Sequence, residues 1–278
     1  MLVYINTNPN TSVLKYDWDA LTYDNISDVI ESWGLDLIER LNWKGNEIVL
    51  DAGCGSGRLT KIISTKLPKG KVFAVDLDSS MIKLANERLG KISNVKFIQS
   101  NICDIELQDK IDVIFSNAVL HWISNHRKVF EHFWQILKPN GQLSIQCGGY
   151  GNLTKTLSVF NKVRKSLEFC NYFCNRKGES IWNEPWYFAK AEDTVKILKE
   201  IGFKNIEVSL ENKVAKFHDK EDYFIFIKTI VLRPYLEYLS NDKLKNMFAK
   251  AVVHEIETNF KELQWKLDYV RLNIHAKK

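Results

Sequence analysis

The segment 51–57 begins with the carboxylate of Asp51 and carries alternate glycines at positions 53, 55 and 57. It directly follows the apolar residues Val49 and Leu50 and precedes a segment with helical spacing, so we expect a strand, a tight turn and a helix. Glycine permits a positive φ in such a turn, lets a ligand approach bare main chain and exposes N–H groups at the start of a helix. The pattern therefore predicts a loop that binds a small ligand.

Two common nucleotide loops do not fit this spacing. A P-loop needs Lys and then Ser or Thr after its last glycine, whereas Arg58 and Leu59 follow Gly57. A dinucleotide loop runs Gly-x-Gly-x-x-Gly, whereas this one runs Gly-x-Gly-x-Gly after Asp51, whose carboxylate would repel a pyrophosphate. The same carboxylate favours a ligand with a cationic amine, and S-adenosylmethionine carries an ammonium together with a sulfonium.

Further polar residues follow the next strands that we expect. Asp76 ends the second strand, where its side chain can accept hydrogen bonds from both ribose hydroxyls of a nucleoside. The later strands end near Asn101 and at Ser116 and Asn117. In open α/β sheets ligands bind beyond the carboxyl ends of the strands, so these residues should share one rim with Asp51. The sequence therefore predicts a site for one nucleoside.

Strands and helices alternate through the first 150 residues. In the segment 26–41 apolar residues recur at helical spacing, while Glu31, Asp36, Glu39 and Arg40 can face water. Residues 138–141 predict the end of a helix. Alternation of this kind predicts a parallel sheet with helices on both faces, a doubly wound α/β fold. The expected strands are 47–52, 71–76, 95–99, 112–117 and 142–147, and the expected helices are 26–41, 59–67, 79–89 and 126–137.

Beyond position 151 the pattern changes to longer helices. Pro234 interrupts one of them. Apolar and charged residues alternate at 205–217 and 263–275, as expected of edge or antiparallel strands that complete the sheet. The expected helices are 155–174, 191–201, 221–239 and 242–260.

These motifs resemble those of the class I S-adenosylmethionine-dependent methyltransferases. The specific motifs lie between about residues 16 and 145, and a weaker resemblance extends to the C-terminus. The segments that carry it are 51–57, Asp76, Asn101 with Ile102, 116–122, and 137–141, which is similar to the family's turn before its fifth strand.

A subgroup of this family is indicated by two segments. Residues 117–122 and 232–236 are similar to the trans-aconitate methyltransferases, and the triplet 120–122 is similar to juvenile hormone acid methyltransferase. Malonyl carrier-protein methyltransferases are related, and all three kinds methylate carboxylates. The sequence departs from the pattern at Asn101, where the family usually has Asp, and at His121, where the trans-aconitate group more often has Gln.

The resemblance implies a Rossmann-like fold with a mostly parallel seven-stranded sheet and a helical cap. It implies a cap segment at 1–40, a nucleotide-binding core at 41–150, and cap helices with the last strands at 151–278. Asp51 and the glycine main chain would hold the amino-acid end of S-adenosylmethionine, Asp76 the ribose and Asn101 the adenine, while 116–118 would shape the wall beneath the methyl group. The implied cofactor-binding residues are Tyr23, Asp51, Ala52, Gly53, Cys54, Gly55, Gly57, Asp76, Leu77, Asn101, Ile102, Ser116, Asn117 and Ala118.

His121, Arg233 and Tyr23 each have both a functional and a structural interpretation. His121 could orient the substrate or give modest acid/base help, or it could form hydrogen bonds within its own loop. Arg233 could clamp a substrate carboxylate, or it could tie loops together. Tyr23 could close over the methionine end of the cofactor, or it could pack an N-terminal helix onto the domain. The catalytic candidates are therefore His121 and Arg233.

The cysteines and the aromatic residues around position 185 are weaker candidates for functional groups. Cys54 has no base beside it in sequence, which disfavours a nucleophilic role. Cys170 and Cys174 share a face of the expected helix, and we expect them to be small core residues. Without further ligands at suitable spacing, no metal site is expected. The aromatic residues at 182, 186, 187 and 188 could form a lid over an apolar substrate or an ordinary core.

Composition disfavours several classes of protein. The 278 residues include 39 Lys and Arg against 34 Asp and Glu, a formal charge of +5, but no dense basic run that would track nucleic-acid phosphates. We expect no membrane span and no secretory signal, because no long apolar segment is present. Five cysteines without a Cys-x-x-Cys pair predict no disulfide framework and favour the cytoplasm. The oligomeric state stays open between monomer and dimer.

The resemblance thus implies methyl transfer to a small or medium acceptor, most of all to a carboxylate oxygen. A carboxylate is already nucleophilic at neutral pH, so alignment and desolvation can supply the rate without an obligatory base. One alternative is an N- or C-methyltransferase, in which His121 would matter more because a proton must leave. Another is a binding module that keeps the nucleotide pocket without transferring methyl groups. Methylation of RNA or protein is disfavoured because basic and acidic residues are interspersed.

Overall fold

The computed structural model describes Ile26 and residues 28–278. Tyr23 lies outside the described residues, so its role over the methionine end of the cofactor stays a prediction. Within the described part of the chain, every helix is too short or too polar to span a bilayer.

The chain forms two compact units. The first comprises the described residues up to 150 together with 186–211 and 271–278, and the second comprises 151–185 and 212–270. The segments that return to the first unit carry one helix and parts of two strands, which the sheet needs to be complete.

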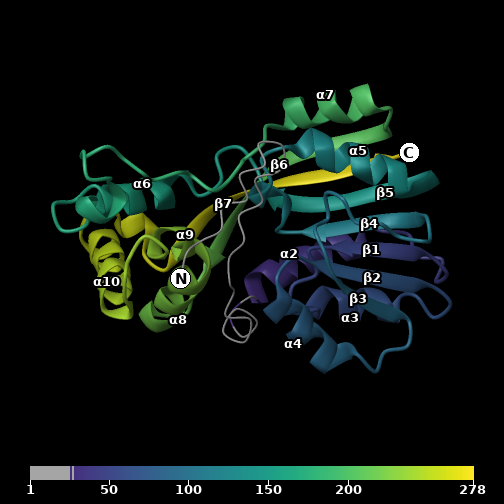
Figure 1. Cartoon of the computed structure of the whole chain (residues 1–278), viewed down its shortest axis with the longest axis horizontal. Coiled ribbons are helices and arrows are strands. Elements are labelled where there is room, and N and C mark those ends of the chain that lie inside the picture. Colours follow the sequence, from purple (N-terminus) through teal and green to yellow (C-terminus); the bar gives the residue numbers. More distant parts are fainter. Residues whose placement is uncertain (1–25, 27) are drawn as a thin grey trace. The chain divides into compact units, whose positions relative to one another are not determined.

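The sheet has seven strands in the order β3-β2-β1-β4-β5-β7-β6 (Figure 1). The five strands β1 to β5 pair in parallel, and β7 runs antiparallel to β5. This confirms the predicted doubly wound, mostly parallel seven-stranded fold. From β1 the chain first extends the sheet on one side and then, with β4, on the other, so the topological switch point lies between β1 and β4. The strands are β1 (Ile48–Ala52), β2 (Lys71–Asp76), β3 (Val95–Gln99), β4 (Ile111–Asn117), β5 (Leu137–Gly148), β6 (Lys204–Lys216) and β7 (Lys266–Lys277).

Both faces of this sheet are covered, and successive residues of β1 show it. Val49 packs in a cluster with α2 and α3, whereas Leu50 packs in a second cluster that includes α5 and α7. Side chains alternate between the faces of a strand, so a strand buried on both faces is apolar almost throughout. The helices of the first unit are α2 (Asp28–Glu39), α3 (Arg58–Thr65), α4 (Ser79–Leu89), α5 (His126–Ile136) and α7 (Ala191–Ile201), with a 3₁₀ turn at Leu120–Trp122.

The segment 138–141 differs from the expectation. It was predicted to separate α5 from a strand at 142–147, but β5 already begins at Leu137, which pairs with Ile111 of β4. The pairing then shifts and resumes between Val113 and Gln142. Asn140 has a positive φ of 65°, and Pro139 has no N–H to donate. These residues therefore form a bulge within β5 rather than a separate turn.

The second unit contains mainly helices around an aromatic core. The predicted helix 155–174 is too long, because α6 ends at Arg164 and a 3₁₀ turn follows at Cys170–Phe173. This break places Phe169 and Phe173 against Phe248, at ring distances of 5.1 and 5.9 Å. The helices of this unit are α6 (Thr154–Arg164), α8 (Lys220–Phe226), a π-helical turn at Ile227–Val231, α9 (Arg233–Leu236) and α10 (Asp242–Asn259), with a further 3₁₀ turn at Lys261–Leu263.

The two cysteines of this region also correct an expectation. Cys170 begins the 3₁₀ turn and Cys174 follows it in extended backbone, so the two do not share a helix face. Both are half-buried rather than part of the core.

Candidate active site

Two carboxylates lie at the carboxyl ends of adjacent strands in the first unit. Asp51 of β1 pairs with Ala74, and Asp76 ends β2. Asp51 is 2% exposed, and the hydroxyl of Thr60 donates a hydrogen bond of 2.6 Å to its Oδ2. Burial, partly offset by this hydrogen bond, raises the pKa of Asp51 to about 7. A cationic group beside Asp51 would favour its ionised form.

The loop between β1 and α3 closes onto β2 through its main chain. Gly53 and Cys54 both donate their N–H groups to the carbonyl oxygen of Val75, over 2.8 and 2.9 Å. Gly55 donates to Oδ2 of Asp76 over 2.9 Å. The expectation that the loop exposes its N–H groups to a ligand is therefore wrong for these three residues, because the end of β2 accepts them.

Glycine is favoured at positions 53 and 55 for different reasons. Gly53 has a φ of +83°, and a Cβ atom there would lie 2.1 Å from Cγ2 of Val119. Gly55 has a φ of +54°, but no atom lies within 4 Å of the place of its missing Cβ. Packing and backbone both demand glycine at 53, whereas at 55 the backbone alone favours it.

Asp76 holds this loop and keeps capacity to accept further hydrogen bonds. Its Oδ1 accepts from the N–H of Asp78 over 2.9 Å, and its Oδ2 accepts from Gly55. Burial raises the pKa of Asp76, and these N–H groups oppose the rise. Each carboxylate oxygen offers a further lone pair, which is the arrangement that two ribose hydroxyls require. The adjacent Leu77 is half-buried.

Asn101 and Ile102 lie in the turn after β3. Oδ1 of Asn101 accepts a hydrogen bond of 3.0 Å from the N–H of Cys103, so the amide already has a role within its own turn. Ile102 is 5% exposed and belongs to the hydrophobic core. The contacts of both residues with adenine stay predictions.

The end of β4 carries three of the predicted residues. Ser116 is buried and donates through its hydroxyl to the carbonyl oxygen of Ala52 over 2.7 Å, which ties β4 to β1. Asn117 donates through Nδ2 to the carbonyl oxygen of Ile30 in α2 over 3.1 Å. Its Oδ1 is buried and accepts no hydrogen bond from the part of the chain that the structure describes. Ala118 has a positive φ of 61°, which turns the chain away from the sheet.

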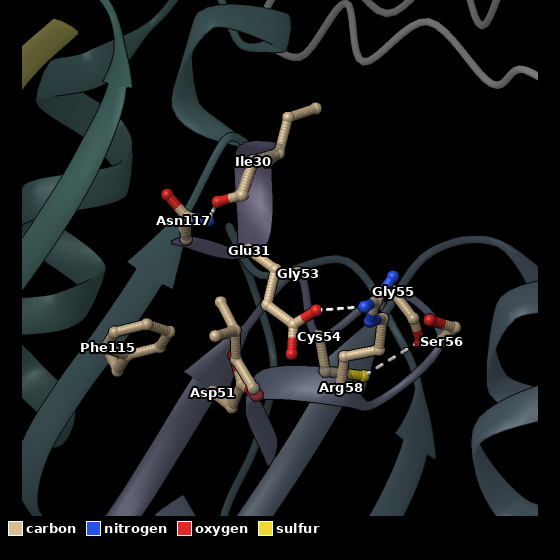
Figure 2. A pocket seen from close by; sticks show the side chains of 11 residues that line it. Ile30, Glu31, Asp51, Gly53, Cys54, Gly55, Ser56, Arg58, Phe115 and Asn117 are labelled. Atoms are coloured by element: carbon tan, nitrogen blue, oxygen red, sulfur yellow. Dashed lines mark hydrogen bonds and ion pairs between the residues drawn. The ribbon is translucent and has the colours of Figure 1, made fainter. Parts of the chain in front are cut away.

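A pocket opens beside the switch point, between the ends of β1 and β4 and the helices α2 and α3 (Figure 2). It brings together four predicted residues of the motif, namely Asp51, Gly53, Cys54 and Gly55, with Asn117 of β4. The other described candidates do not line it, namely Ala52, Gly57, Asp76, Leu77, Asn101, Ile102, Ser116, Ala118, His121 and Arg233. The lining residues are Ile30, Glu31, Asp51, Gly53, Cys54, Gly55, Ser56, Arg58, Leu59, Phe115 and Asn117.

Glu31 and Arg58 line this pocket although the sequence did not indicate them. Glu31 was expected to face water, but its side chain is only 20% exposed and forms an ion pair with Arg58. Arg58 also pairs with Asp28 over 2.6 Å. The available signal was the spacing of Asp28 and Glu31, because residues three apart share a helix face and can bracket one cation.

Cys54 lines the same pocket, and its thiol is neutral. Burial, together with the charges of Asp51 and Asp76, raises the pKa of Cys54 well above its usual range. This argues against a nucleophilic thiolate, in the same direction as the sequence.

His121 follows β4 and is held by the end of β5. The N–H of Gly148 donates to Nδ1 of His121 over 3.2 Å. Nδ1 therefore carries no proton, and the neutral ring has its proton on Nε2. Burial, reinforced by the positive charge of Arg271, lowers the pKa of His121 well below its usual range. The rings of Trp122 and Phe188 lie 5.3 and 6.2 Å from the imidazole.

A buried polar network, which sequence reasoning missed, lies beside this histidine. Arg271 of β7 is 2% exposed and donates through Nε to Oε1 of Gln146 over 3.2 Å. Gln146 donates to Oδ1 of Asn273 over 2.8 Å, and Asn273 donates to Glu211 over 3.3 Å. The guanidinium lies 5.2 Å from the ring centre of Trp33. Only the antiparallel pairing of β7 with β5 brings Arg271 to Gly148.

Arg233 and the aromatic residues near 185 are divided between the two units. Arg233 begins α9 of the second unit, with Nε 3.9 Å from Oε1 of Glu237, and its contact with a substrate stays a prediction. Trp182 belongs to the second unit and stacks on Tyr235 at 4.1 Å. Trp186 belongs to the first unit and lies 5.9 Å from Trp122.

Most of the chain matches a known protein family. Residues 44–251, more than half of the chain, match the family described as "Methyltransferase domain". The chain belongs to this family. It is a class I methyltransferase that uses S-adenosylmethionine, as the sequence predicted.

Curated relatives and a solved structure agree with this assignment. The methyltransferase is 30% identical to the malonyl-[acyl-carrier protein] O-methyltransferase of Priestia megaterium over 80% of this chain and 81% of the relative. It is 33% identical to the trans-aconitate 2-methyltransferase of Rhodopseudomonas palustris over 47% and 50% of the two chains. The fold is similar to that of the Haemonchus contortus phosphoethanolamine N-methyltransferase 2 in complex with S-adenosylhomocysteine, with a TM-score of 0.60 and 19% identity over 94% of this chain. The methyltransferase spans 57% of that protein.

The residues of the pocket fit the cofactor chemically. Two carboxylates, Asp51 and Glu31, line it together with bare main chain at Gly53. The buried Oδ1 of Asn117 adds an acceptor that a donor from a ligand could use. A ligand with an ammonium and a sulfonium matches this acidic lining.

Proposed function

We propose that the methyltransferase transfers a methyl group to a carboxylate oxygen of a small or medium acid and that His121 binds this acceptor. S-adenosylmethionine supplies an electrophilic methyl group on its sulfonium. Within the proposal, Asp76 receives the ribose hydroxyls, Asn101 lies at the adenine, and 116–118 form the wall beneath the methyl group. The observation that carries the acceptor class is the hydrogen bond from the N–H of Gly148 to Nδ1 of His121.

The neutral His121 is a hydrogen-bond donor at Nε2 rather than a base. Its Nδ1 lone pair is engaged by the N–H of Gly148, and Nε2 carries the proton. A carboxylate oxygen can accept this proton in a hydrogen bond and needs no base, because it is already ionised at neutral pH. The donor would orient the acceptor and leave its second oxygen for the reaction.

An amine acceptor makes a different demand on the same side chain. The amine must lose a proton during methylation. His121 could accept this proton only after its own Nε2 proton had moved, or after Nδ1 had lost the hydrogen bond from Gly148. Its low pKa makes a protonated ring unfavourable as well. The geometry therefore favours an anionic oxygen over an amine.

The surroundings of His121 favour an anion with apolar surface. The aromatic rings of Trp122 and Phe188 lie beside the imidazole, and the ring of Trp186 lies beside that of Trp122, so this position has apolar surroundings. The buried charge of Arg271 is near enough to lower the pKa of His121, so the same field attracts a negative group. The names of two curated relatives, a malonyl carrier-protein O-methyltransferase and a trans-aconitate methyltransferase, support the same class.

The test uses the alkali lability of methyl esters. The protein is incubated with methyl-labelled S-adenosylmethionine and a panel of mono- and dicarboxylic acids, free and as carrier-protein thioesters. We expect a labelled product that releases its label as volatile methanol on mild alkaline hydrolysis. Label that resists alkali would mean N- or C-methylation, and transfer to no acid in the panel would contradict the proposal.

A further inference from the structure

We propose that Glu31 and Arg58 form the binding site for the amino-acid end of S-adenosylmethionine, with Arg58 receiving its carboxylate and Glu31 its ammonium. This deepens the cofactor assignment and does not depend on the acceptor. Both residues lie outside the glycine motif, on the helices that flank it.

The two side chains lie in the right place for this role. Glu31 comes from α2 and Arg58 from the first turn of α3, and both line the pocket that contains Asp51 and the glycine loop. Figure 2 shows the carboxylate of Glu31 turned toward the guanidinium of Arg58 across this pocket. Their side chains are 20% and 29% exposed, so a ligand can reach both.

The charges of this pair match those of the ligand. The amino-acid end of the cofactor is a zwitterion, with one ammonium and one carboxylate on the same carbon. A pocket with only acidic groups would favour the ammonium but repel the carboxylate. An Arg–Glu pair offers each charge an opposite partner, and the planar guanidinium suits a carboxylate particularly well.

Two further features support a bound carboxylate at Arg58. Arg58 is the first residue of α3, an eight-residue helix whose N-terminal end favours negative charge. Asp28 pairs with Arg58 from outside the pocket, but its side chain is 79% exposed, and an exposed pair of this kind is weak. A ligand carboxylate can therefore replace it at low cost.

The position of α2 is fixed by a contact that does not use this pair. Nδ2 of Asn117 donates to the carbonyl oxygen of Ile30, next to Glu31. Leu37 and Ile38 of α2 also pack in one buried cluster with Ile63 of α3. Glu31 and Arg58 thus lie on elements that remain held together when the ligand separates their charges.

The experiment varies the ligand and the protein together. Calorimetry measures binding of S-adenosylhomocysteine, its decarboxylated and deaminated analogues, and 5′-methylthioadenosine, which has no amino-acid end. Arg58→Gln should lower the affinity for S-adenosylhomocysteine and for the deaminated analogue, which keeps only the carboxylate, by about tenfold to hundredfold. Glu31→Gln should lower the affinity for S-adenosylhomocysteine and for the decarboxylated analogue, which keeps only the ammonium. Both variants should bind 5′-methylthioadenosine as the unchanged protein does.

The matched control is Lys66→Gln, which breaks the ion pair of Lys66 with Glu39 at the C-terminal end of α2 and should leave every affinity unchanged. Arg58→Lys should recover part of the lost affinity, since it keeps the charge but loses the planar fork. Equal weakening of all four ligands would show a purely structural role and overturn the proposal, as would unchanged binding of S-adenosylhomocysteine. Because no acceptor is present, these outcomes are independent of whether the product is a methyl ester.

Discussion

The two halves of the sheet edge in the first unit differ in how they handle charge. At the ends of β1 and β2, buried carboxylates are bound by hydroxyl and main-chain donors, and an ion pair lies beside them. At the ends of β4 and β5, a neutral histidine lies among aromatic rings, and the nearby charge is a buried arginine. The first half is acidic and suits a cation, and the second is apolar with a positive field.

This difference separates two tasks that one methyl transfer requires. A sulfonium and an ammonium are held best where negative groups are already in place, whereas an anionic acceptor is attracted by positive charge and becomes more reactive when water is excluded. We expect substitutions in the first half to act through its buried carboxylates and its glycine turn, and a substitution of His121 to act on the acceptor alone.

The largest effect is expected at Asp51 and concerns stability. Because the folded state raises its pKa from 3.8 to about 7, it holds the proton more tightly than the unfolded state does, and the free energy of unfolding falls as pH rises between these values. The full loss is about 4 kcal/mol above about pH 7. Asp51→Asn should remove this loss, so the variant is more stable than the unchanged protein in mild alkali and similar to it in mild acid. Chemical denaturation without cofactor, across this pH range, measures the difference.

The control for Asp51→Asn is Asp193→Asn on α7, which removes an exposed carboxyl and should leave the pH dependence unchanged. A saturating amount of S-adenosylmethionine should reduce the pH dependence of the unchanged protein, because its positive charge favours the carboxylate. An equally steep curve for Asp51→Asn would mean that other groups cause the loss.

The next largest effect is expected at Gly53. Gly53→Ala forces a Cβ atom against Val119 and into a left-handed backbone, and should lower the free energy of unfolding by about 3 kcal/mol. Gly55→Ala meets no neighbour and should cost about 1 kcal/mol from its backbone alone. Denaturation curves for the two variants compare them directly. Equal losses would contradict the packing argument.

The smallest effect is expected at His121 and should not reach the cofactor half. His121→Ala should lower kcat/KM about tenfold to hundredfold by removing one hydrogen bond to the acceptor, with the affinity for S-adenosylhomocysteine unchanged. His121→Gln keeps an N–H donor and should recover part of the activity. Since the pKa of His121 is well below its usual range, the kcat/KM of the unchanged protein should show no step near pH 6.5 from this residue. A step there that disappears in His121→Gln would identify a base instead.

Much of the fold could be predicted because its signals are local. Strands β2 and β3 and helices α4 and α7 have the predicted bounds, since apolar periodicity and adjoining turn residues define them within a few positions. The errors occurred where distant contacts compete with local preference. The bulge in β5 depends on pairing of Leu137 with Ile111, and the end of α6 depends on packing of Phe169 and Phe173 against Phe248.

The candidate site divides in the same way. Asp51, the glycines and Asp76 are joined by a strand, a tight turn and one crossover, so their convergence follows from the topology. The topology did not indicate Glu31 or Arg271. A glutamate on an amphipathic helix normally faces water, and a lone arginine in a strand of mixed character shows its burial only when the neighbouring strand is known.

By itself the sequence determined the sheet class, the glycine turn and the acidic strand ends, because each depends on steric and hydrogen-bonding preferences within a short segment. Only the tertiary structure decided that α2 contributes Glu31 to the pocket, that Gly148 selects the tautomer of His121 and that β7 brings Arg271 beside it. These contacts join residues up to 150 positions apart in the sequence. The free energy that forms them comes from the packing of the whole core rather than from any one segment.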